Sequence, residues 1–248
     1  MILQFHARTF ALLQKHPAYA PGADIALTAL EKRIHTPLPA ALWEWYSMED
    51  ALDILNRYSN TDPALPPSQM RLITTHDTPR PRHFLTFRHE NQGVCTWAIE
   101  LDGSDDPPVF VDYDTDFHDP IDCSAPFSTH LYTCVWDWAK VVHRCFIQAQ
   151  NGPLSEYALT FLRSRFTAGP ITYGFPGDTQ YRFLRGDECV LVWTRGELAD
   201  WHLATDTITT LATLIRTLWP LDGLNISLWS HTPVGQALLD HFRQSPPT

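Results

Sequence analysis

Three short runs of β-branched and aromatic residues follow one another in the middle of the chain, at residues 83–88, 94–101 and 109–113. Two turn-forming sequences, Asn91-Gln92-Gly93 and Asp102-Gly103-Ser104, separate them. Runs of this length and composition, bounded by turn residues, are typical of β-strands. Because the connections are too short to hold a crossover helix, we predict three neighbouring antiparallel strands.

Helical patterns flank these strands on both sides. Apolar side chains at helical spacing predict helices over residues 5–13, 25–34, 38–46, 48–58 and, after the strands, 127–148. The last of these is long enough to lie across the sheet, and Cys145 falls on its apolar stripe. Residues 59–82 are rich in proline and show no period, which predicts a surface loop.

The last hundred residues repeat the same order of elements. A short helix is expected over 154–166, strands over 181–184, 189–193 and 199–204, and then a helix pair whose first member ends at Pro220. Strands followed by covering helices, in place of alternating strands and helices, predict an α+β fold. We expect a domain over residues 1–150 and a C-terminal α+β extension over 151–248, either separate or packed into the same unit.

The charge balance limits the partners that the chain can bind. It has 28 acidic and 18 basic side chains and a formal net charge of −10. This excess repels nucleic acid and anionic membranes and suits a basic protein partner. The first residues lack the pattern of a secretion signal, and the five cysteines form no Cys-x-x-Cys pair. We therefore expect a cytoplasmic protein without disulfides.

The central block also carries a family resemblance. Residues 84–87, the turn Glu90-Asn91-Gln92-Gly93, the strand that holds Trp97, and Asp106-Pro107-Pro108-Val109 stand in the order seen in the SUKH superfamily. Over residues 22–148 the chain resembles this family, which includes the Smi and Knr cell-wall regulators of yeast and many bacterial immunity proteins of polymorphic toxin systems. The resemblance implies an antiparallel sheet covered by helices.

The resemblance further implies a function without catalysis. It predicts an immunity protein that covers the active site of a cognate toxin, such as a nuclease or a deaminase. A regulatory or scaffold module that binds cellular partners is the alternative. A hydrolase with a dispersed site is a third hypothesis, since catalytic groups can assemble from distant residues.

Few residues suggest chemistry of their own. His130 and Cys134 stand four apart on one face of the expected long helix and could share a metal ion, but no third ligand is evident. Asp112, Asp114 and Asp116 imitate the start of a calcium loop, yet Phe117 occupies the position that requires glycine. We predict no catalytic residue, no cofactor and no metal site.

An acidic segment provides the candidate partner-binding surface. Aspartates crowd residues 102–122, and aromatic residues lie among them. Such a segment is either a solvated loop or a surface that steers a basic partner, with an aromatic anchor inside an acidic rim. The residues that we predict to bind the partner are Asp105, Asp106, Asp112, Asp114, Asp116, Phe117, Asp119 and Asp122.

Overall fold

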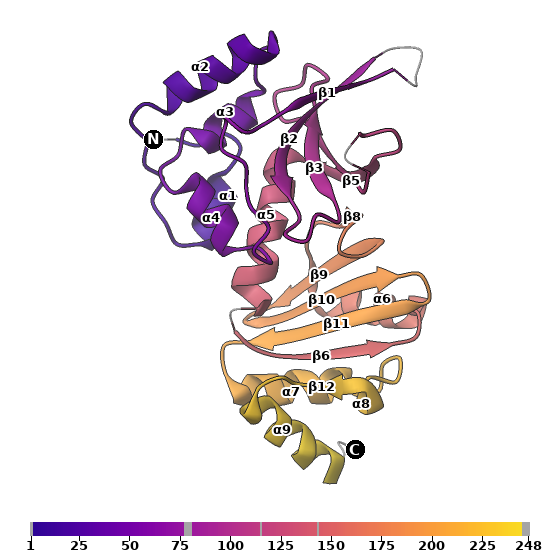
Figure 1. Cartoon of the computed structure of the whole chain (residues 1–248). Helices are drawn as coiled ribbons and strands as arrows, with labels where there is room; N and C mark the ends of the chain where they lie inside the picture. Colours follow the sequence, from indigo (N-terminus) through magenta and orange to yellow (C-terminus); the bar gives the residue numbers. More distant parts are fainter. Residues whose placement is uncertain (1, 77–80, 115, 143, 245–248) are drawn as a thin grey trace. The chain divides into compact units, whose positions relative to one another are not determined.

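The computed structural model describes residues 2–76, 81–114, 116–142 and 144–244 (Figure 1). The fold is α+β, as the sequence predicted, with antiparallel sheets and covering helices. It divides into two compact units, Met1–Trp136 and Asp137–Thr248. The boundary between the units lies between residues 136 and 137, whereas the sequence predicted it between residues 150 and 151. Each unit has its own sheet.

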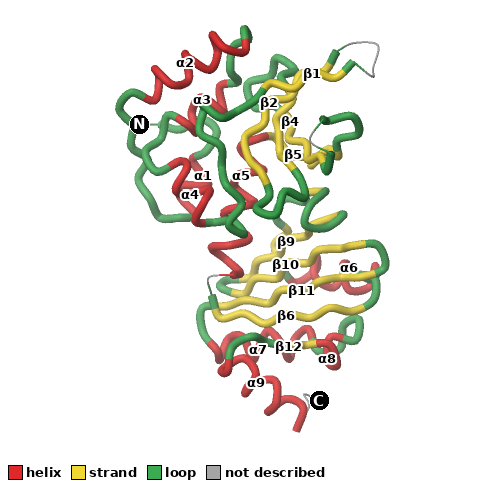
Figure 2. Tube along the Cα trace, in the orientation of Figure 1, coloured by secondary structure: helices red, strands yellow, loops and turns green. Residues whose placement is uncertain are grey.

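Four helices open the first unit, and all four were predicted. They are α1 (Ala7–Leu12), α2 (Ala23–Ile34), α3 (Ala40–Tyr46) and α4 (Ala51–Arg57). Helix α2 ends at Ile34, and the residue after it, His35, adopts the left-handed conformation that commonly closes a helix. Pro39 stands immediately before α3, where its fixed backbone angle suits the start of a helix. Figure 2 shows α1 to α4 gathered beside the sheet and not interleaved with its strands.

The first sheet has five antiparallel strands in sequence order. They are β1 (Leu72–Thr75), β2 (Arg82–His89), β3 (Thr96–Glu100), β4 (Pro108–Asp112) and β5 (Ile121–Pro126). The three predicted strands, β2 to β4, are confirmed. The prediction of a loop over 59–82 was wrong for β1. Pairing with β2 holds these four residues extended, and a run of four residues is too short to show the pattern of a strand in the sequence.

Two apolar layers hold the first unit together. Trp45 of α3 and Phe87 of β2 are fully buried. Phe127 begins α5 (Phe127–Asp137), and its ring meets the Phe87 ring edge-on, with 5.2 Å between the ring centroids. On β2, Phe84 belongs to a smaller cluster with Phe110, at 5.4 Å. The sheet is therefore apolar on both faces, which explains why its strands read as nearly continuous hydrophobic runs.

The second unit is built on a sheet of longer strands. Its main members are β6 (Cys145–Asn151), β9 (Thr179–Arg185), β10 (Glu188–Arg195) and β11 (Leu198–Thr205). Three short strands, β7 (Thr167–Ala168), β8 (Thr172–Tyr173) and β12 (Leu228–Trp229), extend it. All pairings are antiparallel, in the order β12-β6-β11-β10-β9-β7, with β8 also on β9. The three strands predicted in this region correspond to β9, β10 and β11.

Helices cover one face of this second sheet. They are α6 (Glu156–Arg165), α7 (Ile208–Leu218), α8 (Leu224–Ser227) and α9 (Pro233–Gln244). Ser155 caps α6 and Thr207 caps α7, each accepting a hydrogen bond from a backbone N–H of the first turn. Trp201 of β11 and Leu214 of α7 are fully buried in the shared core.

The prediction of one helix over 127–148 was wrong at its C-terminal end, from Cys145 onward. Helix α5 ends at Asp137, a π-helical turn, η1 (Trp138–Val142), follows it, and Cys145 begins β6. Ile147 and Ala149 are buried and alternate with Gln148 and Gln150 on the other face, a period of two that pairing with β11 selects. Cys145 is consequently exposed, and not part of an apolar helical stripe.

Candidate functional site

The predicted acidic segment is divided by the strand that runs through it. Asp105 and Asp106 precede β4, whereas Asp114, Asp116 and Asp119 follow it, so the two groups lie at opposite ends of a five-residue strand. Such a strand is about 17 Å long. The eight predicted residues therefore do not form one continuous surface.

Asp106 has a structural task. Its carboxylate accepts hydrogen bonds from the backbone N–H of Ser128, at 2.9 Å, and from the Ser128 hydroxyl, at 2.5 Å. These contacts lie in the first turn of α5, where backbone N–H groups lack partners within the helix and a negative charge is favourable. Asp106 thus caps the N-terminus of α5, although it lies 22 residues before Ser128 in the sequence.

This role predicts a stability effect. Asp106→Ala should lower the free energy of unfolding of the first unit by about 1 kcal/mol, the usual cost of removing a helix cap. Asp106→Asn, which keeps an acceptor oxygen, should cost less. Hydrogen exchange of peptides from the first unit, followed in increasing denaturant, tests the order for the two variants. Equal losses would contradict a role that depends on an acceptor oxygen at position 106.

Asp112 and Phe117 also face inward. Phe117 is 1% exposed and stacks on Phe84, with 5.0 Å between ring centroids, so it cannot be the surface anchor that the sequence predicted. The buried carboxylate of Asp112 accepts a hydrogen bond from the backbone N–H of Phe117 and another from Asp114 at 3.3 Å. The predictions for these two residues were wrong because the loop folds back to cover the sheet, and both serve that closure.

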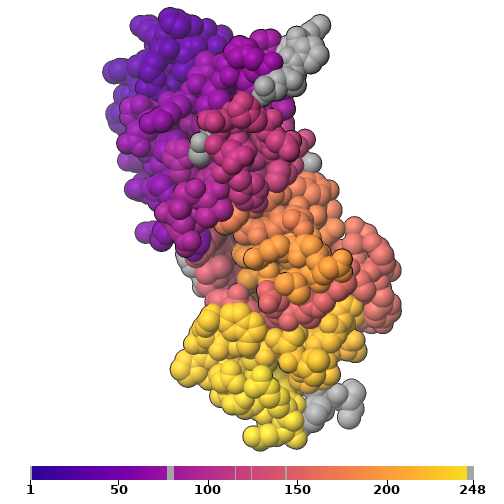
Figure 3. All heavy atoms as spheres, turned by 45° about the vertical axis from the view of Figure 1, so that its right-hand side comes forward, coloured from indigo at the N-terminus to yellow at the C-terminus, as the bar shows by residue number. Residues whose placement is uncertain are grey.

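The remaining carboxylates keep an accessible surface, which we call the acidic loop surface. It comprises Asp114, Asp116, Asp119 and Asp122, all exposed, together with Tyr113 and Ile121, which are 47% and 40% exposed. These residues occupy the β4–β5 connection and the start of the edge strand β5. In Figure 3 the atoms of this part of the chain, coloured between magenta and pink, lie at the surface. Asp105 is exposed as well but stands apart from them.

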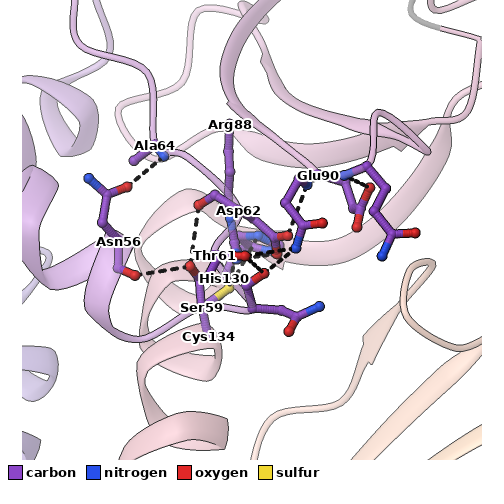
Figure 4. A network of polar contacts seen from close by, with 12 residues as sticks. Asn56, Ser59, Thr61, Asp62, Ala64, Arg88, Glu90, His130 and Cys134 are labelled. Carbon is purple, nitrogen blue, oxygen red and sulfur yellow. Dashed lines mark hydrogen bonds and ion pairs between the residues drawn. The ribbon is translucent and has the colours of Figure 1, made fainter.

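A buried ion pair lies at the centre of a polar network in the first unit (Figure 4). The Arg88 guanidinium of β2 donates to the Asp62 carboxylate at 2.8 Å, and both side chains are 6% exposed. A second guanidinium nitrogen donates to the sulfur of Cys134 in α5 at 3.3 Å. The same guanidinium lies 4.8 Å from the centroid of the Trp97 ring. Arg88 thus connects a loop, a strand and a helix.

Neighbouring loops are fastened to this pair. Asp62 accepts a hydrogen bond from the backbone N–H of Asn91 at 3.2 Å. Glu90 accepts two more, from Gln92 at 2.6 Å and Val94 at 3.1 Å, and so shapes the turn that the sequence predicted at Asn91-Gln92-Gly93. The turn at Asn91-Gln92-Gly93 is therefore held by the carboxylates of Asp62 and Glu90.

The metal hypothesis for His130 and Cys134 finds no support in this geometry. The two residues do approach each other, with 3.6 Å between Nε2 of His130 and the sulfur. The Cys134 sulfur also accepts a hydrogen bond from the Arg88 guanidinium, a cation that would repel a metal ion. Within the described ranges no group of three or more metal-binding side chains occurs.

The buried thiols are poor nucleophiles. Burial raises the pKa of Cys95 to about 12 and that of Cys189 to about 11, and it raises the pKa of Cys123 as well. A thiol attacks as the thiolate, so these three groups are unreactive near neutral pH. The five cysteines, all in described parts of the chain, form no disulfide.

Sequence reasoning missed Arg88 and Asp62. The available signal was a charged residue inside the apolar run of β2, since buried arginine requires a partner.

Comparison with known proteins does not identify the chain: no family model, no curated protein and no solved structure matches it. None of the described helices is long and apolar enough to cross a membrane.

Proposed function

We propose that the chain is a non-catalytic binding protein of the SUKH type, an immunity protein that neutralises a basic toxin domain by covering its active site. The observation that carries this proposal is the acidic loop surface. Four exposed carboxylates stand within nine residues there, beside the partly exposed side chains of Tyr113 and Ile121. The net charge of −10 adds a field of the same sign.

The proposed mechanism needs complementarity and no reaction. A nuclease or nucleic-acid deaminase lines its substrate groove with basic side chains, because it must hold phosphates. Negative charge on the binding protein attracts such a groove, speeds association and excludes partners of the same sign. The Tyr113 ring is suited to anchor the contact, since tyrosine often dominates the binding energy at interfaces.

The first experiment identifies the partner. The tagged chain is used to capture proteins from its native cell, and the captured partner is then expressed with and without the chain. The proposal expects a stoichiometric partner with a basic domain whose toxicity disappears on co-expression. A partner that remains toxic when the complex is fully formed would refute the immunity function.

The second experiment tests the surface. Changing Asp114, Asp116, Asp119 and Asp122 to asparagine should slow association with that partner by at least about tenfold at low salt and flatten its salt dependence. The control removes the same charge from exposed sites elsewhere: Glu49, Asp53, Glu156 and Glu197, each changed to its amide. Stopped-flow association rates decide the result. Equal slowing by both sets would show that net charge acts without a defined surface.

A further inference from the structure

The second sheet has a polar face opposite its helix-covered core. Antiparallel register places Trp229, Gln148 and His202 in one row across β12, β6 and β11. The adjacent row holds Gln150, Asp200 and Trp193 of β6, β11 and β10. These two rows present amides, indoles, one imidazole and one carboxylate, whereas the opposite face of the same strands packs a large apolar core against the helices.

Residues of these two rows line an open pocket of about 400 Å³. Trp193 and Trp229 line it, and the Trp229 ring is 37% exposed. The Trp193 ring lies 4.4 Å from the His202 ring between centroids. The pocket is therefore large enough for a small ligand and presents flat aromatic walls to it.

The charges of the pocket cancel. Asp200 accepts a hydrogen bond from the Gln150 amide at 2.7 Å and forms an ion pair with Arg195 at 3.0 Å. Burial lowers the pKa of His202 to about 4, so its imidazole is neutral at pH 7. A pocket of this kind favours a neutral ligand over an ion.

Two buried donors at this pocket are unsatisfied. The Gln148 amide nitrogen, which can only donate, lies 3.2 Å from Nδ1 of His202, so Nδ1 accepts and the proton of the neutral ring is on Nε2. Neither Nε2 of His202 nor Nε1 of Trp193 has a hydrogen-bond partner among the described residues. A buried polar group without a partner is costly, and an acceptor oxygen supplied by a ligand would remove that cost.

We infer that this pocket binds a neutral saccharide that carries an N-acetyl group. The C–H face of a sugar ring packs on an indole, because the negative face of the ring attracts the positive C–H edges. Sugar hydroxyls can exchange hydrogen bonds with Gln148, Gln150 and Asp200. The acetamido carbonyl has two lone pairs and no proton, which suits donors that cannot accept, such as those of the Trp193 and His202 rings, whose centroids lie 4.4 Å apart.

The test uses N,N′-diacetylchitobiose and, as its matched control, cellobiose, which has the same linkage and no acetamido groups. Isothermal titration of the full chain should show saturable binding of the first sugar and at least about tenfold weaker binding of the second. Trp229→Ala should weaken binding of diacetylchitobiose by about tenfold. Tyr157→Ala removes an aromatic ring that is 69% exposed on α6, outside the pocket, and should change nothing.

Three results would overturn the inference. They are no binding of diacetylchitobiose at millimolar concentration, equal binding of cellobiose, and equal weakening by the Trp229 and Tyr157 substitutions. A circular dichroism spectrum unchanged from the parent chain shows that the Trp229 variant is folded. The acidic loop surface plays no part in this test, so its outcome is independent of the proposed immunity function.

Discussion

Asp62→Ala is expected to lower the free energy of unfolding of the first unit by about 3 to 5 kcal/mol, because it leaves the Arg88 guanidinium buried without its counter-charge. The carboxylate also accepts the backbone N–H of Asn91, so the turn that follows β2 loses a fastening at the same time. The contacts that Arg88 keeps, with the Cys134 sulfur and the Trp97 ring, cannot replace a carboxylate, since neutral sulfur is a weak acceptor and the ring carries no charge.

The measurement must separate the two units, because a single unfolding midpoint is ambiguous for a chain with two compact units. Hydrogen exchange of peptides from β2 and β3, followed in increasing urea, reports the first unit alone. Lys15→Ala is the matched control, because it breaks the exposed ion pair with Asp50, whose side chains are 37% and 52% exposed. That change should cost at most about 1 kcal/mol. Similar losses for both variants would contradict the special role of the buried pair.

The elements were predictable where local pattern and tertiary pairing agree. Helices α1 to α4 and strands β2 to β4 each carry their own periodicity and their own turn residues, so one sequence suffices to locate them. The segment that begins at Cys145 carries an ambiguous pattern, because its apolar residues fit either a helix or a strand. Only pairing with β11, more than fifty residues away, decides the matter, and no local rule contains that information.

The candidate surface shows the same limit at the level of side chains. The sequence identified the acidic segment but gave all its aspartates one role. Asp106 reaches α5, Asp112 closes its own loop, and only the aspartates beyond residue 113 share one accessible surface. Phe117 could be assigned only by seeing the Phe84 ring on which it stacks. Whether an aspartate faces a partner or a backbone N–H depends on contacts between segments, which spacing alone does not reveal.

The polar pocket escaped prediction for a related reason. Gln148 and Gln150 were placed in or just after a helix, where they would share no face with His202. Once β6 is a strand, register with β11 sets Gln148 opposite His202 and Gln150 opposite Asp200. A single wrong period therefore concealed both a strand of the second sheet and the polar groups on its face.

Acidification should destabilise the second unit through His202. Burial lowers the pKa of this residue from 6.5 to about 4, against a smaller opposing influence of Asp200. Between these values the unfolded chain binds a proton and the folded chain does not, so the free energy of unfolding falls as the pH falls. The loss develops between about pH 6.5 and pH 4 and reaches about 3 kcal/mol, since each unit of pKa difference is worth about 1.4 kcal/mol.

His202→Asn isolates this contribution. Asparagine does not titrate, and its side-chain oxygen can accept the hydrogen bond that Gln148 now gives to Nδ1. Hydrogen exchange of peptides from β10 and β11 in increasing urea reports the second unit alone. Comparing the parent and the variant at pH 7 and at pH 4.5 gives the difference between them, in which the exposed histidines shared by both chains cancel. Between pH 7 and pH 4.5 the free energy of unfolding of the variant should fall by about 2 to 3 kcal/mol less than that of the parent. If the difference between parent and variant stays constant across this range, the pKa of His202 is the same in the folded and unfolded chain, and the lowered pKa is disproved.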